Sequence, residues 1–428
     1  MRVTLPRSAS LTLDITSLAV GGDGVAHTSF RGTQRAVFLP QVAPGERVEA
    51  RVDLSSSPAR GQVVSVLTTS GSRRVPPCPH AADCGGCPWM FLDDEGQRRA
   101  REHLLEVTVL RALGGRSPEE VTLHEAPSRE HYRTRARLAF SGKRGLAVGY
   151  RRPRSHQIER VSRCLVLAPA LEPLLGRLGA WLEHTRGEGE ISLALGRQGR
   201  PVIELKWTRG EPPASLFASL ERAVREGELA GASVRSEGAR SPAVVGDPTA
   251  WTEGADGEPL EAPAFAQAHP GVAVQIGEHL RRLAGQGRPA VVELFAGAGT
   301  FTVLLAPGNP SYIAVEESQT SCEAARRNLE RRGLDHVRVQ QADASTWKIP
   351  PRTSLVILDP PRTGARAVAE ALASSSVAEL LYVSCDPVTL ARDLSILTEG
   401  RYEVRSLHGY DLFPQTSHLE VVAHLKRC

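Results

Sequence analysis

The sequence predicts an α/β protein whose C-terminal part is a doubly wound, mostly parallel sheet, preceded by a small β-barrel and a central α+β region. From residue 265 onward, short apolar segments alternate with amphipathic ones, as strands and helices alternate in such sheets. Short β-like segments broken by Gly, Pro and Ser fill the N-terminal part, and a cysteine cluster follows them. We therefore expect domains at residues 1–67, 68–264 and 265–428.

The N-terminal domain shows the alternation of a sheet with one buried face. Leu11, Leu13 and Ile15 alternate with polar residues, and a glycine-rich turn follows at residues 21–24. Such a unit could close as an OB-like barrel, a common platform for nucleic acids. A β-domain without any ligand explains the pattern equally well.

The remaining elements are predicted from apolar runs and helical periodicity. Helices are expected in the central domain at residues 97–113, 170–184 and 214–226. The C-terminal domain is expected to contain, in chain order, helix 272–285, strands 290–295 and 311–316, helix 319–332, strands 337–343 and 355–359, helix 364–373, strand 379–384, helix 387–398, and strands 402–409 and 419–427.

Composition limits the protein class. With 41% hydrophobic and 23% charged residues among 428, a globular chain with a real core is expected. No apolar run approaches the length that spans a bilayer, and the N-terminus lacks the apolar core of a signal peptide. We expect a cytoplasmic protein without membrane association. The seven cysteines, an odd number, argue against a disulfide framework in that compartment.

Positive charge is concentrated in one stretch of a nearly neutral chain. The formal net charge is only +4, yet residues 129–163 contain eleven Arg and Lys against two Glu, a local charge of +9. Tyr132, Phe140 and Tyr150 are interleaved with these arginines. Cationic side chains follow a phosphate backbone and aromatic faces stack on bases, so this stretch predicts contact with RNA.

A candidate cofactor site lies at the ends of the first three C-terminal strands. Gly297 and Gly299 follow the first strand and allow a sharp turn that approaches a ligand closely. Glu316 ends the next strand, where it can bind ribose hydroxyls, and Asp343 ends the third, where it can meet an adenine amino group. This order predicts S-adenosylmethionine. NAD is the alternative, although Thr302 stands where the dinucleotide fingerprint has its third glycine.

Two further strand ends carry reactive side chains. Asp359 opens an Asp-Pro-Pro-Arg turn, in which the prolines stop the strand and stiffen the loop. Cys385 follows an apolar strand and precedes a helix that Pro387 could start. A helix N-terminus would lower the pKa of the Cys385 thiol. We predict that Cys385 is a nucleophile rather than a buried structural thiol.

A thiolate has a clear use in methyl transfer to uracil. C5 of uracil is not nucleophilic enough to attack a sulfonium methyl group, but addition of a thiolate to C6 makes it so. After the transfer, a general base must remove the C5 proton so that the thiolate can leave. Glu420 is the candidate base, and His418 is its competitor.

The cysteine cluster is a candidate metal site. Cys78, Cys84 and Cys87 lie within ten residues, and Cys164 could supply a fourth thiolate. Four thiolates suit zinc or a [4Fe–4S] cluster. Three close cysteines with one distant cysteine favour the iron–sulfur cluster, because zinc sites more often combine two C-x2-C pairs.

Together these motifs resemble the bacterial 5-methyluridine RNA methyltransferases that carry a TRAM domain and an iron–sulfur cluster. The likeness covers nearly the whole chain. The matching motifs are SLAVGGDGVAH at residues 17–27, CPHAADCGGC at 78–87, YRTRARLAF at 132–140, GYRR at 149–152, FAQ at 265–267, ELFAGAGTF at 293–301, DPPR at 359–362, SCDP at 384–387 and DLFPQTSHLE at 411–420.

The resemblance implies a role for each motif. The nucleophile would be Cys385, the base Glu420, and the N-terminal barrel a TRAM domain that grips RNA. The RNA would be 23S rRNA or, as in some relatives, tRNA, and the enzyme is expected to be a monomer. The implied cofactor-binding residues are Gln267, Phe295, Gly297, Thr300, Glu316, Asp343 and Asp359, and the implied [4Fe–4S] ligands are Cys78, Cys84, Cys87 and Cys164.

Two positions depart from the family pattern, and the sequence is also compatible with other functions. Thr300 and His269 stand where the family usually has Asn, which affects a cofactor contact and the positioning of the substrate. A non-catalytic RNA-binding or redox-sensing protein on the same scaffold is one alternative. Cytosine-C5 methylation is disfavoured because the DPPR motif lacks a cysteine. Methylation of an amino group is disfavoured because Arg362 replaces an aromatic residue.

Overall fold

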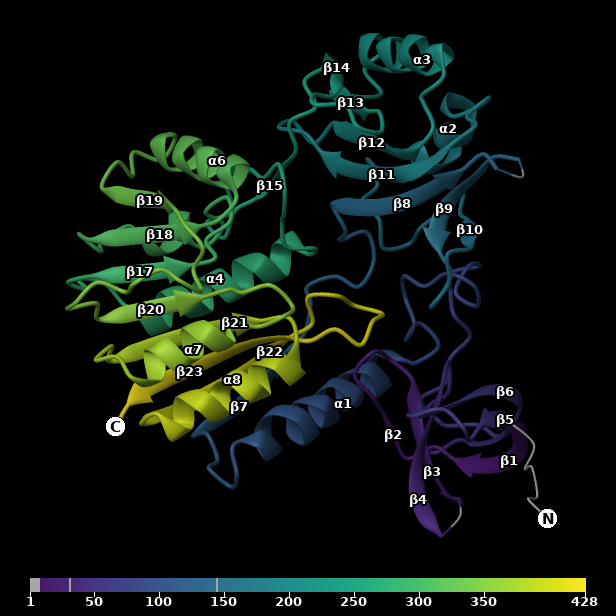
Figure 1. Cartoon of the computed structure of the whole chain (residues 1–428), viewed down its shortest axis with the longest axis horizontal. Coiled ribbons are helices and arrows are strands. Elements are labelled where there is room, and N and C mark those ends of the chain that lie inside the picture. The colour runs from purple at the N-terminus through teal and green to yellow at the C-terminus, as the bar shows by residue number, and fades with distance from the viewer. Residues whose placement is uncertain (1–7, 31, 144) are drawn as a thin grey trace.

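A computed structural model describes residues 8–30, 32–143 and 145–428. Residues 1–7 of the first predicted domain and Arg144 of the basic stretch lie outside these ranges. The described chain forms three sheets. The loop between the last two strands reaches from the C-terminal sheet toward the other two sheets (Figure 1). Within the described ranges, no helix combines the length and apolarity needed to cross a membrane.

The N-terminal sheet is open rather than closed. Its strands are β1 (Ser8–Asp14), β2 (Ser17–Leu18), β3 (Gly24–Phe30), β4 (Thr33–Leu39), β5 (Arg47–Asp53) and β6 (Ala59–Thr68). They pair in the order β1-β5-β6-β4-β3-β2, and no pairing between the described parts of β1 and β2 joins the two edges. The predicted closed barrel is therefore wrong at this point. The edge strand β2 has only two residues, too few to form a second ladder.

The cysteine segment leads into a helix that begins earlier than predicted. Asp93 accepts a hydrogen bond from Gly96 N (2.6 Å) and caps α1 (Asp94–Leu104). The chain continues as the π-helical segment η1 (Leu105–Leu110), which packs against α8 of the C-terminal domain. Strand β7 (Glu120–His124) then pairs with β22. The predicted central domain thus contributes a strand to the C-terminal sheet.

The central sheet has one face covered by helices. Its main strands are β8 (Arg135–Ser141), β9 (Ala147–Arg151), β10 (Ile158–Arg160), β11 (Glu188–Leu195), β12 (Pro201–Arg209), β13 (Gly231–Arg235) and β14 (Ala243–Gly246), with β15 (Trp251–Glu253) and β16 (Pro259–Glu261) attached through β11. Leucines of α2 (Leu174–Trp181) and α3 (Ala214–Arg225) form one core with alternate residues of β8, β11 and β12. The residues between them point to the opposite face.

The C-terminal sheet confirms the predicted doubly wound architecture. Its order is β19-β18-β17-β20-β21-β23-β22-β7, with parallel pairing from β19 to β21 and β23 antiparallel to both neighbours. The strands are β17 (Val291–Leu294), β18 (Tyr312–Glu316), β19 (Val337–Gln341), β20 (Leu355–Leu358), β21 (Glu379–Ser384), β22 (Tyr402–Tyr410) and β23 (Glu420–Arg427).

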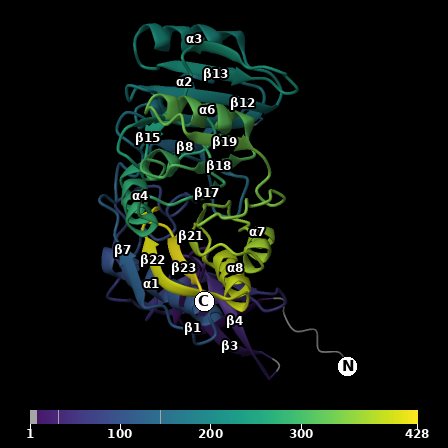
Figure 2. The same cartoon turned by 90° about the vertical axis from the view of Figure 1, so that its left-hand side faces the viewer.

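Helices cover both faces of this sheet. They are α4 (Pro270–Ala284), α5 (Thr302–Leu305), α6 (Gln319–Glu330), α7 (Arg366–Ala373) and α8 (Pro387–Glu399). Val356 and Leu358 of β20 pack toward α7 and α8, whereas Leu355 and Ile357 pack toward α4 and α5. Figure 2 shows α4 on one side of the sheet and α7 and α8 on the other. The strand order reverses between β17 and β20, the position where such sheets bind ligands.

Candidate active site

A cavity of about 550 Å³ lies at the carboxyl ends of β17, β18, β20 and β21. It is lined by all nine residues that the sequence suggested for the cofactor and the reaction: Gln267, Phe295, Gly297, Thr300, Glu316, Asp343, Asp359, Cys385 and Glu420. Parallel strands deliver their C-terminal residues to one edge of the sheet, so motifs more than 150 residues apart in the sequence meet here.

The glycine-rich turn after β17 leaves room for a ligand. Gly297 has a φ of +57° and nothing within 4 Å of where a Cβ would lie, so a ligand can approach its backbone. Its N–H donates to Glu316 Oε2 (2.9 Å), and Ser318 N–H donates to Glu316 Oε1 (2.8 Å). Asp343 accepts from Ser345 N (2.8 Å), and hydrogen bonds to Ser345 hold its pKa below the usual range. Two carboxylates thus border the cavity as acceptors.

Three further carboxyl groups line the cavity in poorly solvated positions. Glu293 accepts from the hydroxyls of Thr302 and Tyr312 (both 2.7 Å), and burial raises its pKa to about 7. Burial and the charge of Glu293 also raise the pKa of Asp359, which accepts from Gln267 Nε2 (3.2 Å). Glu420 is only 2% exposed, and burial followed by the charge of Asp359 raises its pKa well above 4.5. These groups can hold protons near neutral pH.

The thiol of Cys385 is not activated as the sequence suggested. Burial, then the charges of Glu420 and Asp359, raise its pKa to about 12. The expected lowering by the helix N-terminus is wrong because Asp386 occupies that position. Its carboxylate accepts from Val388 N (3.0 Å) and Thr389 N (2.9 Å), the first free amides of α8.

The two candidate bases lie in different surroundings. Glu420 lines the cavity, and its buried Oε2 has no hydrogen-bond partner among the described residues. His418 does not line the cavity, and its Nε2 lies 3.4 Å from Arg362 Nη2. Burial and the charge of Arg362 lower the pKa of His418 to about 4, which makes it a weak base. The geometry favours Glu420.

The comparison with known proteins assigns the chain to a family. It is 35% identical to the 23S rRNA (uracil(1939)-C(5))-methyltransferase RlmD of Chromohalobacter salexigens, over 97% of this chain and 89% of that protein. A family profile described as tRNA (Uracil-5-)-methyltransferase matches residues 351–428. The chain belongs to the RNA uracil-C5 methyltransferase family. It is an S-adenosylmethionine-dependent enzyme that acts on RNA, so the non-catalytic alternative is not supported.

Further comparisons agree with the family. The methyltransferase is 32% identical to an uncharacterized RNA methyltransferase of Thermosynechococcus vestitus, over 98% of both chains. Its fold is similar to the crystal structure of the Pyrococcus abyssi tRNA (uracil-54, C5)-methyltransferase in complex with S-adenosyl-L-homocysteine. The TM-score is 0.74 at 21% identity, over 97% of this chain and 100% of that one.

The lining of the cavity also includes charged and aromatic residues that the sequence had not assigned to the site of the methyltransferase, and four of them are Glu293, Arg362, Phe265 and Phe413. Glu293 was detectable as a lone charge inside an apolar strand. The positive charge of Arg362 lowers the pKa values of Cys385 and Glu420, and so partly offsets the effect of the neighbouring carboxyl groups. Phe265 is 65% exposed, and Phe413 comes from the loop before β23. No sequence pattern indicated that these two rings would meet at the cavity.

A second cavity of about 850 Å³ adjoins the first and shares Phe265, Arg362 and Phe413 with it. Its opposite wall is the face of the central sheet that points away from α2 and α3, with Arg135 and Arg137 of β8. Arg137 is exposed on this wall, whereas Arg135 is half-buried and donates to Ala262 O, and Glu204 and Glu261 also line the space. The arginines that line it next to the methyltransferase cavity suit a polyanion.

Two of the three aromatic residues in the basic stretch do not line this space, although the sequence predicted that they would contact RNA. Phe140 is buried and packs on Trp207, because strand alternation turns it toward α2. Tyr132 is buried and donates from its hydroxyl to Pro414 O (3.1 Å). Only Tyr150 borders the cavity, and its half-buried ring also contacts the cysteine pocket. The base-stacking role predicted for Tyr132 and Phe140 is therefore wrong.

Part of the local positive charge is also neutralised within the protein. Arg152 pairs with Glu159 (2.8 Å) and Arg154 with Asp23 of the N-terminal sheet (2.6 Å). These ion pairs connect structural segments, so the charge available to RNA is smaller than the sequence suggests.

The two departures from the family pattern occupy different places. Thr300 lines the cavity. His269 is buried beside it, with Nε2 3.0 Å from Ser128 O and its ring stacked on Tyr132 at 4.8 Å between centroids. His269 therefore ties the start of α4 to the segment before β8.

The four predicted metal-binding cysteines line one pocket. Cys78, Cys84, Cys87 and Cys164 face it together with Tyr150. Gly86 N–H donates to Cys84 Sγ (3.4 Å). Within the ranges that the structure covers, no group of three or more His, Cys, Asp or Glu is arranged to hold a metal ion. The chain thus brings the four thiols to one pocket.

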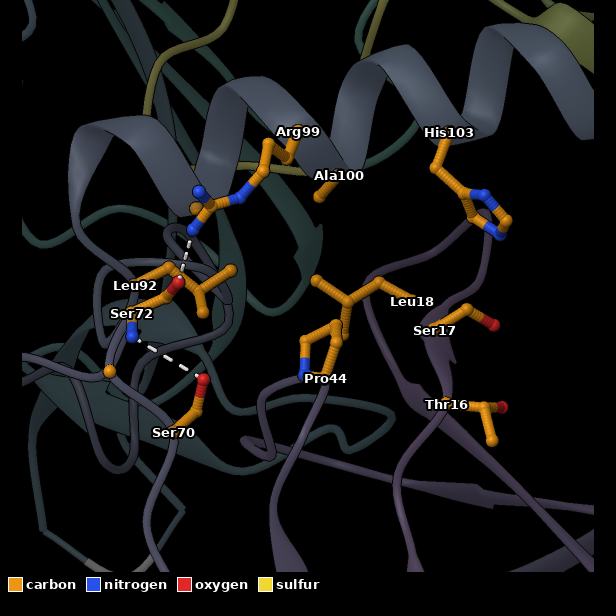
Figure 3. Close-up of a pocket in the computed structure, with 12 residues that line it drawn as sticks. Thr16, Ser17, Leu18, Pro44, Ser70, Ser72, Leu92, Arg99, Ala100 and His103 are labelled. Carbon is orange, nitrogen blue, oxygen red and sulfur yellow. Dashed lines mark hydrogen bonds between the residues drawn. The ribbon is translucent and has the colours of Figure 1, made fainter.

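A third hollow, of about 460 Å³, lies between the N-terminal sheet and α1 (Figure 3). Arg99 and His103 of α1 face Ser17, Ser70 and Ser72 across it, and Arg99 donates to Ser72 Oγ (2.7 Å). None of the predicted site residues lines this hollow.

Proposed function

We propose that the enzyme methylates C5 of one uridine in 23S rRNA, with Cys385 as nucleophile and Glu420 as base. The observation that carries this proposal is the shared cavity, in which Cys385, Asp359 and Glu420 lie with the residues expected to bind the cofactor. The name of the 35% identical relative supports 23S rRNA. The family description supports tRNA as the second candidate. The RNA substrate supports the predicted cytoplasmic location, and the monomeric state stays a prediction.

We propose that the cofactor occupies the glycine-rich end of the cavity. Glu316 suits the ribose hydroxyls and Asp343 the adenine amino group, because each lines the cavity and has carboxylate oxygens that accept hydrogen bonds. Gln267, Phe295, Gly297, Thr300 and Asp359 complete the proposed set. S-adenosylmethionine supplies an electrophilic methyl group when it is bound.

The residues of this chain then carry the proton and bond changes. Cys385 Sγ gives its proton to solvent and adds to C6 as the thiolate, so that C5 gains nucleophilic character and accepts the methyl group. The Glu420 carboxylate removes the C5 proton. The electron pair of the C5–H bond forms the C5–C6 double bond. The Sγ–C6 bond breaks, and its electron pair returns to Cys385 Sγ as the thiolate. The raised pKa of Glu420 strengthens it as a base.

One experiment tests substrate and chemistry together. RNA from a strain lacking this gene is mapped for modification and then offered to the purified enzyme with labelled methyl donor. We expect a single uridine of 23S rRNA to lack its C5 methyl group in the strain and to regain it in vitro. Restoration of a tRNA uridine alone would replace rRNA with tRNA, and methylation of any other atom would overturn the reaction.

We further propose that the cysteine pocket holds a [4Fe–4S] cluster on Cys78, Cys84, Cys87 and Cys164. Support comes from the spacing of the cysteines and from their convergence on one pocket. Such a cluster would cross-link the cysteine segment to the central domain. Anaerobic purification should give equal amounts of iron and acid-labile sulfide, whereas zinc without sulfide would overturn the assignment.

We also propose two RNA-binding surfaces. The arginine-lined cavity beside the active site suits the segment that carries the target uridine. The N-terminal sheet, proposed as TRAM-like, would hold flanking RNA near Arg99 and His103. Competition of RNA with chemical modification of these side chains tests both surfaces.

A further inference from the structure

The loop at residues 411–419 joins β22 to β23 and ends at Glu420. Phe413 of this loop lines both the cofactor cavity and the arginine-lined cavity. Most of the loop is buried although it has no regular secondary structure. Its polar backbone groups must therefore find partners elsewhere in the protein.

Helix α1 supplies two of these partners, Gln97 and Arg101, although it precedes the loop by more than 300 residues. Gln97 is fully buried, and its Nε2 lies 2.8 Å from Gln415 Oε1. In return, Gln415 N–H donates to Gln97 Oε1 (3.1 Å). Gln415 has a φ of +71°, which is unfavourable for a residue with a Cβ. The reciprocal pair with Gln97 helps to hold that conformation.

A buried ion pair fixes the start of the loop. Arg101 Nη2 lies 2.8 Å from Asp411 Oδ1, and the two side chains are 1% and 3% exposed. The same Nη2 donates to Thr416 O (3.0 Å), and Arg129 Nη1 lies 3.6 Å from Asp411 Oδ2. One guanidinium thus holds two points of the loop, and loss of Asp411 would leave the buried charge of Arg101 uncompensated.

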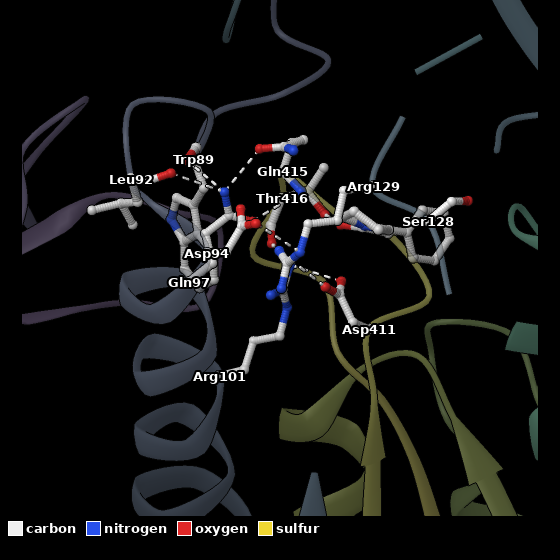
Figure 4. Close-up of polar contacts among 12 residues, drawn as sticks. Trp89, Leu92, Asp94, Gln97, Arg101, Ser128, Arg129, Asp411, Gln415 and Thr416 are labelled. Carbon is white, nitrogen blue, oxygen red and sulfur yellow. Dashed lines mark hydrogen bonds and ion pairs between the residues drawn. The ribbon is translucent and has the colours of Figure 1, made fainter. Parts of the chain in front are cut away.

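Trp89 connects the same loop to the cysteine segment and the N-terminal sheet. Trp89 N–H donates to Gln415 O (3.0 Å), and its indole Nε1 donates to Gly22 O (3.1 Å). Trp89 stands two residues after Cys87. Figure 4 shows Trp89 and Gln97 gathered near Gln415, and Arg101 beside Asp411.

We propose that Gln97 and Arg101 are positioning residues for methyl transfer. From α1 they hold the loop at residues 411–419, so that Phe413 and Glu420 keep their places in the cavity. Neither side chain lines the cavity, so each acts only through the loop. The inference rests on the proposed role of Glu420.

The first test needs no RNA and no cofactor. The charge of Glu420 raises the pKa of Cys385, so the pH midpoint of Cys385 alkylation reports where Glu420 lies. Glu420→Gln should lower this midpoint. Gln97→Ala should move it from the wild-type value toward that of Glu420→Gln, whereas Arg98→Ala, an exposed change on the same helix, should not. A Gln97→Ala midpoint equal to wild type would overturn the inference.

The second test follows turnover. Small displacements of a catalytic group can cost about 100-fold in rate, so we expect Gln97→Ala to lower kcat by about 10- to 100-fold with little change in the KM for S-adenosylmethionine. Gln415→Ala should act similarly. The double variant should lose less than the sum of the two single variants, because both changes break the same contact between the Gln97 and Gln415 side chains. Additive losses, or a loss matched by Arg98→Ala, would overturn the inference.

Two further comparisons distinguish a folding defect from the loss of the positioning role. Arg101→Lys keeps the buried charge but not the two-point contact, so it provides the same tests if Gln97→Ala does not fold. If Glu420→Gln fails to accumulate an RNA adduct while Gln97→Ala still moves the alkylation midpoint, the positioning role stands. In that case it is the proposed chemistry of Glu420 that fails.

Discussion

The cavity at the ends of the C-terminal strands and the basic stretch of β8 and β9 differ in how well the sequence predicted the positions of their residues. At the cavity, the nine residues expected to bind the cofactor or carry the reaction line the same space, and only the competing base His418 does not. In the basic stretch, Tyr132 and Phe140 are buried and several arginines are paired within the protein. The position of a strand end follows from topology alone, but the direction of a side chain within a strand depends on pairing register.

The largest effect should come from removing the proposed nucleophile at the cavity. Cys385→Ala should lower methylation by at least about 10⁴-fold, because C5 is then never activated. S-adenosylmethionine should still bind, as measured by calorimetry. Cys428→Ser, a change at the exposed C-terminal residue, is the matched control. Equal methylation by wild type and Cys385→Ala would refute covalent catalysis.

Next in size is the loss of the proposed base. Glu420→Gln should slow turnover by about 10²- to 10⁴-fold and accumulate a methylated RNA–protein adduct, since elimination fails after transfer. Denaturing gels with labelled RNA measure the adduct. His418→Gln should accumulate no adduct. If His418→Gln accumulated an adduct and Glu420→Gln did not, His418 would be the base in place of Glu420.

The pH dependence of the first turnover should reflect the raised pKa values of Cys385 and Glu420. Their reactive forms are the deprotonated ones, so the rate should rise as the pH is raised above neutral, by up to about tenfold per pH unit for each group that is still protonated. Arg362→Gln removes a cation that lowers both pKa values. The variant should therefore shift the pH–rate profile to higher pH. Each unit of that shift should lower the rate at a given pH by about tenfold. Arg366→Gln, on the exposed face of α7, should leave the profile unchanged.

A smaller effect is expected on the arginine-lined wall. Arg137 is exposed and faces the cavity, so Arg137→Ala should weaken RNA binding at all sequences and reduce the salt slope by about 1. Arg222→Ala on the outer helix α3 is the control. An unchanged salt slope would mean that RNA does not pass along β8.

The smallest effect should come from the buried ring that the sequence had suggested for base stacking. Phe140→Leu should lower the free energy of unfolding by about 1 kcal/mol through imperfect packing against Trp207. RNA affinity should remain at the wild-type value in a filter-binding titration. A clear loss of affinity without loss of stability would restore the stacking interpretation.

The sequence predicted the C-terminal fold well because its strands are short apolar runs bounded by turns. Residues such as Glu316 and Asp343 were found because they end such runs. Cys385 was found too, but not its environment, since the raised thiol pKa depends on Glu420 and Asp359 from distant strands. Likewise, no local pattern indicates that Gln97 meets Gln415.

The pairing of β7 with β22 has a consequence for how the chain can be divided. The methyltransferase sheet begins at residue 120, before the central sheet, and resumes after it, so the central sheet is an insertion within another unit. A fragment starting at residue 265 would lack β7, leaving the long strand β22 as a bare edge with unpaired backbone groups. Such an edge invites aggregation, and a separately expressed catalytic unit would need the polypeptide from α1 onward.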